Sequence, residues 1–257
     1  MTRSVSNNPG GEGIRLNKAL AQAGAASRRG ADELIRTGRV AVNDTIVTDM
    51  GLRVRPGLDR VTLDGAPLAV GEDASTGHVY LMLNKPAMVV STASDPEGRT
   101  TVLDFLPKEF KKYRLFPVGR LDYFSEGLLL LTNDGELTMR LTHPRYHLTK
   151  LYHVRTREIP THEALQTMRK GMRLAEGETL APVGVQLLEE KPPAMLMTLS
   201  QGVNRQIRRM CRDLDLTILS LRRIRTGPLE LGTLAKGGVR ALTEKEVRDL
   251  KKAVGLA

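Results

Sequence analysis

The chain has 257 residues and a formal net charge of +10 at pH 7, from 39 Lys and Arg against 29 Asp and Glu. It has no apolar run near the roughly 20 residues of a membrane-spanning helix, so nucleic acid is a better partner for this charge than a membrane. Cys211 is the single cysteine, which excludes an intramolecular disulfide and any cysteine-rich metal site. Residues 1–13 lack the apolar core of a signal peptide, so we predict a cytoplasmic protein.

Two patterned regions flank a polar, glycine-containing stretch, AVGEDASTGH, at residues 69–78. This composition is typical of a linker. We therefore predict a disordered lead over residues 1–13, a small head domain over residues 14–68 and a larger body over residues 79–257.

The head begins with two short amphipathic helices. Apolar residues at spacings of three and four predict the first over Arg15–Ala23, and Gly24 ends it. Ser27 is placed to cap the second, which is predicted over Arg28–Thr37. The segment VAVNDTIV then predicts a hairpin with its turn at the Asn-Asp pair, and residues 61–68 supply further strand. We expect a helix pair packed on a small sheet.

Basic side chains gather around these helices, where they can contact RNA phosphates or only water. The segment ASRRGADELIRTGRVAVND resembles the RNA-binding domain that is named after ribosomal protein S four. The resemblance extends over nearly the whole head and implies a module that binds structured RNA through its shape and backbone. The candidate RNA contacts in the head are Arg15, Lys18, Arg28, Arg29, Arg36 and Arg39.

The body opens with a strand over Val79–Leu83, which Lys85 and Pro86 end. The segment SDPEGRTTVLDFLP is a turn-rich loop that carries Arg99 and leads into a short helix over residues 102–106.

The segment FPVGRLDYFSEGLLLLTNDGEL predicts a loop over Pro117–Asp122, a strand over Leu128–Thr132 and, after a tight Asn-Asp-Gly turn, a helix over Glu136–Leu141. A buried strand needs no charged pair at its start, yet Arg120 and Asp122 stand there. An aspartate in a loop is more often a turn former or a helix cap than a catalytic group, so spacing alone favours the structural role.

The residue identities change that interpretation, because VGRLDYFSEGLLLLTNDGEL resembles the catalytic motif of pseudouridine synthases, in which an aspartate follows Gly-Arg-Leu. The match lies at Gly119–Asp122, the branch is the RsuA-like one, and the resemblance covers almost the whole chain. One departure is YFSEG in place of an NTSG-like run, which puts Phe124 and Glu126 beside the site. This departure bears on the RNA target more than on catalysis.

Three further segments agree with this branch in order and spacing. KLYHV is similar to the strand whose tyrosine, here Tyr152, lines the uridine pocket. GVNRQIRRMC is similar to the segment whose basic residue, here Arg208, pairs with the catalytic aspartate. LRRIRTGPLELGTLAKGGVRALTEKE is similar to the closing segment, and Leu221 matches its pocket-lining apolar residue. SDPEGR and the overall pattern look closest to the RluB-like members, which modify large-subunit ribosomal RNA.

The resemblance implies isomerisation of uridine to pseudouridine, in which the N1–C1′ bond breaks, the uracil turns over and a C5–C1′ bond forms without any cofactor. Asp122 would attack the sugar or the base, or stabilise developing charge. Arg208 would keep this carboxylate ionised in a dry pocket, and Tyr152 would cover the base and move the C5 proton. The target base must flip out of folded RNA, and Arg120 would hold the opened backbone. The expected substrate pocket includes Arg120, Leu121 and Leu221.

Other reactive side chains have simpler interpretations. Cys211 shares helical spacing with apolar neighbours, which is typical of a core thiol. His143 and His147 are four residues apart, but Pro144 breaks the helix that would align them, and no third ligand is evident, so no metal site is predicted. Further candidate RNA contacts in the body are Lys85, Arg99, Arg205 and Arg209.

Together these features predict an α+β protein with a small RNA-binding head, a linker, and a mixed, largely antiparallel sheet that has the active cleft across its middle. The predicted function is site-specific pseudouridine formation in 23S ribosomal RNA by a monomer that needs no cofactor. The alternatives are the same chemistry on 16S RNA and a ribosome-assembly factor that keeps the fold but lacks catalysis. A DNA-binding regulator ranks below both, because no base-reading helix-turn-helix emerges.

Overall fold

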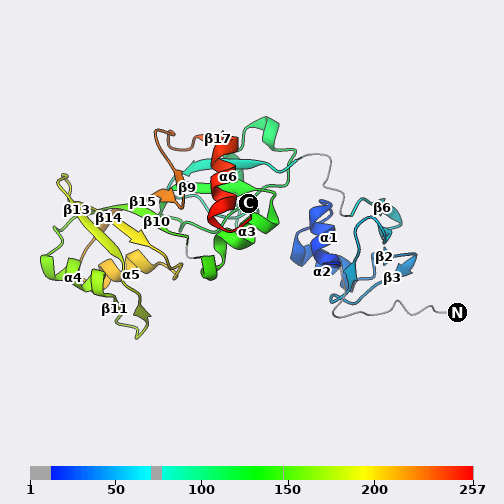
Figure 1. Cartoon of the computed structure of the whole chain (residues 1–257), viewed down its shortest axis with the longest axis horizontal. Coiled ribbons are helices and arrows are strands. Elements are labelled where there is room, and N and C mark those ends of the chain that lie inside the picture. The colour runs from blue at the N-terminus through cyan, green and yellow to red at the C-terminus, as the bar shows by residue number, and fades with distance from the viewer. Residues whose placement is uncertain (1–12, 71–76, 147, 257) are drawn as a thin grey trace. The chain divides into compact units, whose positions relative to one another are not determined.

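The structure is a computed structural model that describes residues 13–70, 77–146 and 148–256, and the chain divides into two compact units, Met1–Gly77 and His78–Ala257 (Figure 1). The predicted disordered lead, apart from residue 13, and most of the predicted linker lie outside the described residues.

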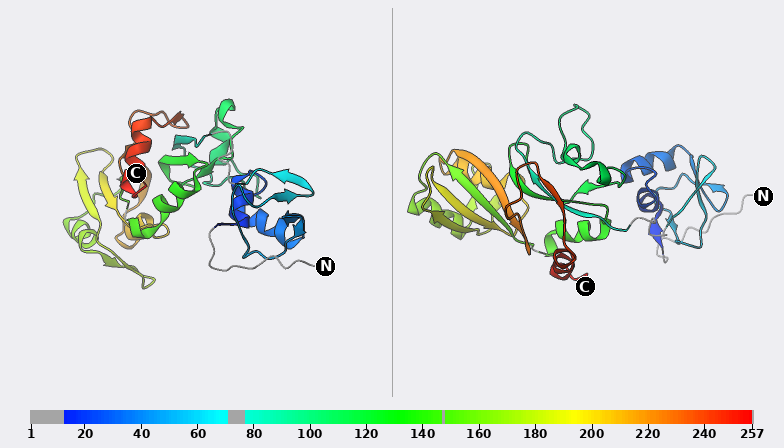
Figure 2. Two further views of the ribbon diagram at one scale, coloured as in Figure 1. Left: turned by 45° about the vertical axis from the view of Figure 1, so that its right-hand side comes forward. Right: turned by 90° about the horizontal axis from the view of Figure 1, so that it is seen from above.

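The N-terminal unit packs two helices against a small sheet (Figure 2). Helix α1 spans Leu16–Gln22 and helix α2 spans Arg28–Arg36. As predicted, Ser27 caps α2, because its side chain accepts a backbone amide hydrogen bond from the first turn. Asn43 and Asp44 have positive φ angles of 50° and 65°, which form the predicted tight hairpin turn. Local chemistry therefore decides both features.

The head strands are β1 Ile14–Arg15, β2 Val40–Val42, β3 Thr45–Ile46, β4 Arg53–Val54, β5 Val61–Leu63 and β6 Ala66–Leu68. Four of them form an antiparallel sheet in the order β3-β2-β5-β6, while β1 pairs with β4. The strand predicted over residues 61–68 is therefore a hairpin, because Asp64 and Gly65 both adopt positive φ and turn the chain.

A nine-stranded sheet forms the C-terminal unit. Its strands are β7 Tyr80–Lys85, β8 Phe116–Pro117, β9 Glu126–Thr132, β10 Lys150–Thr156, β13 Gly184–Leu188, β14 Ala194–Leu199, β15 Ile218–Thr226, β16 Leu229–Glu230 and β17 Val239–Ala241. Seven lie in the order β13-β14-β10-β15-β9-β7-β17, with β8 and β16 paired to β9 and β15. Only the β15–β9 pair is parallel among the described strands, which confirms the predicted mixed, largely antiparallel sheet.

That parallel pair joins the two halves of the sheet. Arg222 lies opposite Glu126, and Arg223 lies opposite Gly127. Gly127 has a φ of +102°, and a Cβ at this position would lie 2.2 Å from the carbonyl oxygen of Arg223. Only glycine permits so close an approach, so this residue fixes where the start of β9 meets β15.

Helices cover both halves of the sheet. They are α3 Gly135–Thr142, α4 His162–Lys170, α5 Gln206–Asp213 and α6 Glu244–Ala253, and the short 3₁₀ turns are η1 Val102–Phe105, η2 Lys108–Phe110 and η3 Pro144–Tyr146. The helix predicted over residues 102–106 is thus a 3₁₀ turn. A separate two-stranded hairpin consists of β11 Met172–Arg173 and β12 Thr179–Leu180.

Strand β9 is buried on both faces, which accounts for its run of four leucines. Leu128 and Leu130 pack with α3 and α6, which lie on the same side of the sheet in Figure 2, and Leu129 and Leu131 pack with η1. In the other half, α4 and α5 cover β10, β13 and β14. Among the described residues, no helix is both long and apolar enough to cross a membrane.

Candidate active site

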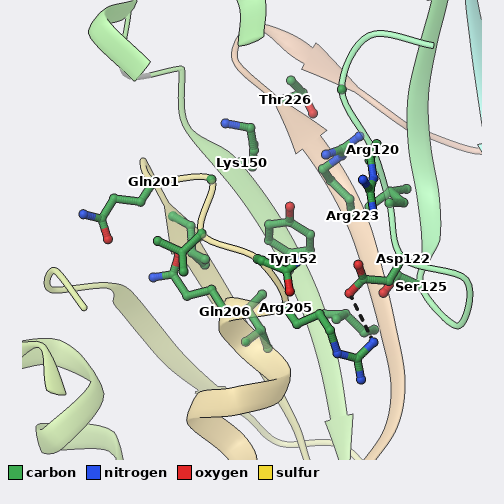
Figure 3. Close-up of a pocket in the computed structure, with 18 of the residues that line it drawn as sticks. Arg120, Asp122, Ser125, Lys150, Tyr152, Gln201, Arg205, Gln206, Arg223 and Thr226 are labelled. Atoms are coloured by element: carbon green, nitrogen blue, oxygen red, sulfur yellow. Dashed lines mark ion pairs between the residues drawn. The ribbon is translucent and has the colours of Figure 1, made fainter. Parts of the chain in front are cut away.

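A pocket of about 390 Å³ lies where the two halves of the sheet meet. Its walls come from the loop before β9, from β10 and β15, and from residues 199–208, which lead into α5 (Figure 3). The volume falls in the range of small-ligand sites, about 300–1,000 Å³. Six residues predicted from the sequence line it together: Arg120, Leu121, Asp122, Tyr152, Arg208 and Leu221.

Asp122 lies in a loop whose backbone is held on both sides. The hydroxyl of Ser91 donates to the carbonyl oxygen of Leu121 at 2.8 Å and accepts from the amide of Leu121 at 3.1 Å. The amide of Ser125 donates to the carbonyl oxygen of Asp122 at 2.9 Å. These bonds fix the backbone from which the Asp122 side chain projects, as a reacting group requires.

Lys85 lies buried beneath this loop. Its side chain has no exposed area, and Nζ donates to the carbonyl oxygens of Pro86 at 2.9 Å, Asp122 at 3.2 Å and Ser125 at 2.9 Å. Burial lowers the pKa of Lys85 to about 8, against the opposing effect of the Glu126 and Asp122 carboxylates. The structure therefore corrects the prediction of an RNA contact for Lys85, because its ammonium group holds the loop instead of facing a phosphate.

The carboxylate of Asp122 faces two arginines. Its Oδ2 lies 3.9 Å from Nη1 of Arg205 (Figure 3) and 3.9 Å from Nε of Arg208. Both distances exceed hydrogen-bond length, so the charge is stabilised while the oxygens stay open to a substrate. Nη2 of Arg208 donates to the carbonyl oxygen of Phe124 at 2.9 Å and to the hydroxyl of Ser125 at 3.2 Å, which fixes the guanidinium. Burial lowers the pKa of Arg208, but a guanidinium stays charged in proteins.

Tyr152 and Leu221 supply apolar walls. Tyr152 lies opposite Arg223 across β10 and β15, and Leu221 lies opposite Val154, so Tyr152 and Leu221 are near neighbours along one face. The tyrosine ring packs against two core clusters and projects into the pocket beside Asp122 (Figure 3). A flat ring and a branched aliphatic side chain suit a nucleobase, which has two apolar faces.

Comparisons with known proteins agree with this geometry. Residues 79–213 match the family described as RNA pseudouridylate synthase, and residues 14–59 match the S4 domain. This chain belongs to the RNA pseudouridylate synthase family. The synthase is 41% identical over 243 residues to the "Ribosomal large subunit pseudouridine synthase B" of Bacillus subtilis (strain 168), which covers 92% of this chain and 95% of that relative.

Two further similarities extend over most of the synthase. A protein of the same name from Pseudomonas aeruginosa is 36% identical, over 95% of this chain and 63% of the relative. A solved structure described as the crystal structure of a pseudouridylate synthase has a TM-score of 0.65 and 27% identity, and the match covers 92% of this chain and 99% of that one. The family of the chain and the folds of its N-terminal and C-terminal units are therefore established.

Several polar residues of the synthase pocket were not predicted. Gln206 begins α5, is 4% exposed, and has two amide atoms without a hydrogen-bond partner in the described part of the chain. The sequence could have indicated Gln206, because it lies in the segment GVNRQIRRMC. It could have indicated Lys150 in the same way, because this residue begins the segment KLYHV. The unpredicted polar lining residues are Ser125, Thr142, Lys150, Gln201, Asn204, Gln206, Arg223 and Thr226.

The predicted RNA contacts of the body divide into two kinds. Arg205 lines the pocket, where it adopts a left-handed φ of 48° at the start of α5. Arg209, next to Arg208 in sequence, points elsewhere and pairs with Glu176 and Glu178 at 2.6 Å each. Outside the pocket lining, the side chain of Arg99 forms ion pairs with Asp95 and Glu97, at 2.8 and 3.0 Å.

The predicted RNA contacts of the head divide in the same way. Arg36 pairs with Glu33 at 2.5 Å, and Arg39 pairs with Asp64. Four others have side chains with no ion pair or hydrogen bond to any residue that the structure describes: Arg15, Lys18, Arg28 and Arg29.

Cys211 is a buried core thiol, as predicted. It belongs to the cluster around α5, and burial raises its pKa to about 12. In the described ranges, no three His, Cys, Asp or Glu side chains lie close enough together to hold a metal ion. Of the two histidines weighed as metal ligands, His147 lies outside the described residues.

Proposed function

We propose that this synthase isomerises a specific uridine to pseudouridine in large-subunit ribosomal RNA, with Asp122 as its catalytic carboxylate. The observation that carries the proposal is the position of Asp122, whose carboxylate faces a nucleoside-sized pocket between two arginines. The names of the Bacillus and Pseudomonas relatives support the large subunit as the substrate. We also propose a monomer that acts in the cytoplasm.

The arrangement suits a reaction that rearranges bonds without a change in composition. A uridine flipped out of the RNA stacks on Tyr152, and Asp122 acts on the sugar or the base as the N1–C1′ bond breaks. The detached uracil turns so that C5 bonds to C1′, the C5 proton leaves and N1 gains a proton. Arg208 and Arg205 place positive charge 3.9 Å from the carboxylate of Asp122, where it can stabilise negative charge during the reaction.

Tritium release tests this proposal. Ribosomal RNA transcripts that carry tritium at uridine C5 are incubated with the wild type, and each turnover releases tritium to water. We expect release from the 23S transcript. Release from the 16S transcript alone would move the substrate to the small subunit, and release from neither transcript nor immature subunits would favour a non-catalytic assembly factor.

Asp122→Asn is the matched variant for the catalytic role. The loop is held through the backbone oxygen of Asp122 and not through its side chain, so the variant should fold normally. We expect turnover to fall by at least about 10³-fold, because an amide cannot act as the nucleophile, while RNA affinity changes by less than about threefold. Loss of binding together with activity would indicate a structural aspartate.

A further inference from the structure

One end of the pocket carries positive charge that no acid balances. Asp122 is the one acidic residue among the lining residues that the structure describes, and it lies near Arg205 and Arg208. Lys150 and Thr226 lie at the other end of the view in Figure 3. Five lining residues are basic: Arg120, Lys150, Arg205, Arg208 and Arg223.

A β-bulge builds this basic end. Lys150 lies opposite Thr226 on β10 and β15, and Tyr152 lies opposite Arg223. The register shifts between these pairs, because β15 takes three residue steps where β10 takes two. Residues three apart on a regular strand point to opposite faces, whereas a bulge reverses this alternation. Arg223 and Thr226 consequently both line the pocket, together with Lys150.

The cations at this end have backbone partners but no carboxylate. Nζ of Lys150 donates to the carbonyl oxygen of Leu148 at 3.0 Å, and Nε of Arg223, which is 5% exposed, donates to that of Leu128 at 2.8 Å. Within the described ranges, neither residue forms an ion pair. Burial lowers the pKa of Lys150, and the nearby charge of Arg223 lowers it further. The repulsion between these two positive charges, which are partly removed from water, is reduced when an anion binds beside them.

Thr226 adds an unused polar group. It is 8% exposed, and its hydroxyl is shielded and has no hydrogen-bond partner among the residues that the structure describes. Buried hydroxyls normally have a hydrogen-bond partner. The unpartnered hydroxyl of Thr226, in a pocket end with two cations, therefore indicates that a bound ligand supplies the partner.

We propose that Lys150, Arg223 and Thr226 form a subsite for one phosphodiester group of the substrate RNA, next to the flipped uridine. This inference rests on the proposed function, because it requires an RNA strand in the pocket. The guanidinium fork and the ammonium group match the oxygens of a phosphate. A phosphate held here keeps the ribose beside Asp122 while the uracil is detached and turning, which is when the substrate has its fewest other attachments.

Ethylation interference tests the subsite without advance knowledge of the target uridine. The phosphates of a 23S transcript are ethylated at random, which removes their charge, and the molecules bound by the full-length Asp122→Asn protein are separated from the unbound ones. We expect ethylation of one phosphate beside the modified uridine to weaken binding about tenfold. The modified uridine itself is mapped from wild-type turnover of the same RNA.

The second arm adds Lys150→Gln to the same protein, with Lys170→Gln on the exposed surface of α4 as the matched control. We expect Lys150→Gln to reduce interference at that phosphate to below about twofold and to leave all other phosphates unchanged. Lys170→Gln should leave the pattern intact. Interference that persists at full strength in Lys150→Gln would overturn the proposal.

Thr226→Val keeps the experiment decisive if Lys150→Gln fails to fold. Valine has the shape of threonine but removes a hydroxyl that has no partner, so stability should be unchanged or slightly increased. We expect a smaller reduction, about threefold, at the same phosphate. If Lys150→Gln does not fold, unchanged interference in Thr226→Val, with the wild type still releasing tritium, would overturn the subsite alone. No tritium release by the wild type would overturn the proposed function.

Discussion

In the N-terminal unit, Arg36 and Arg39 pair with carboxylates on the same surface, whereas the pocket of the C-terminal unit holds a group of cations around one carboxylate. Arg36 and Arg39 each pair with an acidic residue in the head, but Lys150 and Arg223 of the pocket have no such partner in the described chain. A paired arginine must give up its carboxylate before it binds a phosphate, whereas a buried unpaired cation gains stability when one arrives. Net charge alone therefore does not locate the RNA-binding surface.

The largest expected effect is the loss of turnover on substitution of one of two adjacent arginines of α5, which tests the comparison between paired and pocket-facing cations. Arg208 faces Asp122, and Arg209 pairs with Glu176 and Glu178. We expect Arg208→Met to lower turnover by about 10²- to 10³-fold, since the partly exposed carboxylate of Asp122 loses a stabilising charge. Arg209→Met is the matched control and should lower turnover by less than about tenfold. Single-turnover tritium release measures both, and equal losses would mean that α5 as a whole, and not Arg208, is required.

Lys85 represents a third arrangement, a cation held by carbonyl oxygens. Lys85→Met should lower the free energy of unfolding by about 2–4 kcal/mol, because the variant leaves buried carbonyl groups without a donor. Urea unfolding measures this change. An unchanged stability would show that water replaces the ammonium group beneath the loop.

The free energies of unfolding of the wild type and of Lys85→Met should also depend differently on pH. The folded pKa of Lys85 is about 8, below the ordinary value of 10.5, so between these values the unfolded chain keeps a proton that the folded chain has lost. The stability of the wild type relative to Lys85→Met should therefore rise with pH from about 8 upward, by up to about 1.4 kcal/mol per unit. Unfolding at pH 7, 8 and 9 measures this slope, and a constant difference would mean that Lys85 stays charged in the folded state.

The smallest expected effect concerns the head. Arg28→Ala with Arg29→Ala removes two cations whose side chains have no partner among the described residues, whereas Arg36→Ala with Arg39→Ala removes two that are paired. We expect the first double variant to weaken RNA binding about tenfold and to reduce the salt dependence by about one unit of slope per residue. The second should weaken binding by only about twofold. Filter binding over a range of salt concentrations measures both, and equal slopes would remove the distinction between paired and unpaired arginines.

Local sequence chemistry predicted much of the secondary structure. The Ser27 cap and the Asn43-Asp44 turn depend on residues within a few positions of one another, so the chain carries them wherever it folds. Two errors were also local: residues 61–68 turn at Asp64-Gly65, and residues 102–106 close as a 3₁₀ turn. The first error was a missed local signal, because Asp-Gly is typical of a two-residue hairpin turn. In the second, a short apolar segment is compatible with more than one conformation.

The sequence by itself determined the fold class and the resemblance to the family, and that resemblance implied that Asp122, Tyr152 and Arg208 share a pocket, because the motifs that carry it are continuous stretches of the chain. Tertiary structure alone decided which charged side chains are buried, which are paired and which line the pocket. Lys85 lies beneath a loop 37 residues away, and Arg223 reaches the pocket through a bulge between β10 and β15. Burial and pairing depend on which distant strands become neighbours, and no local pattern specifies that register.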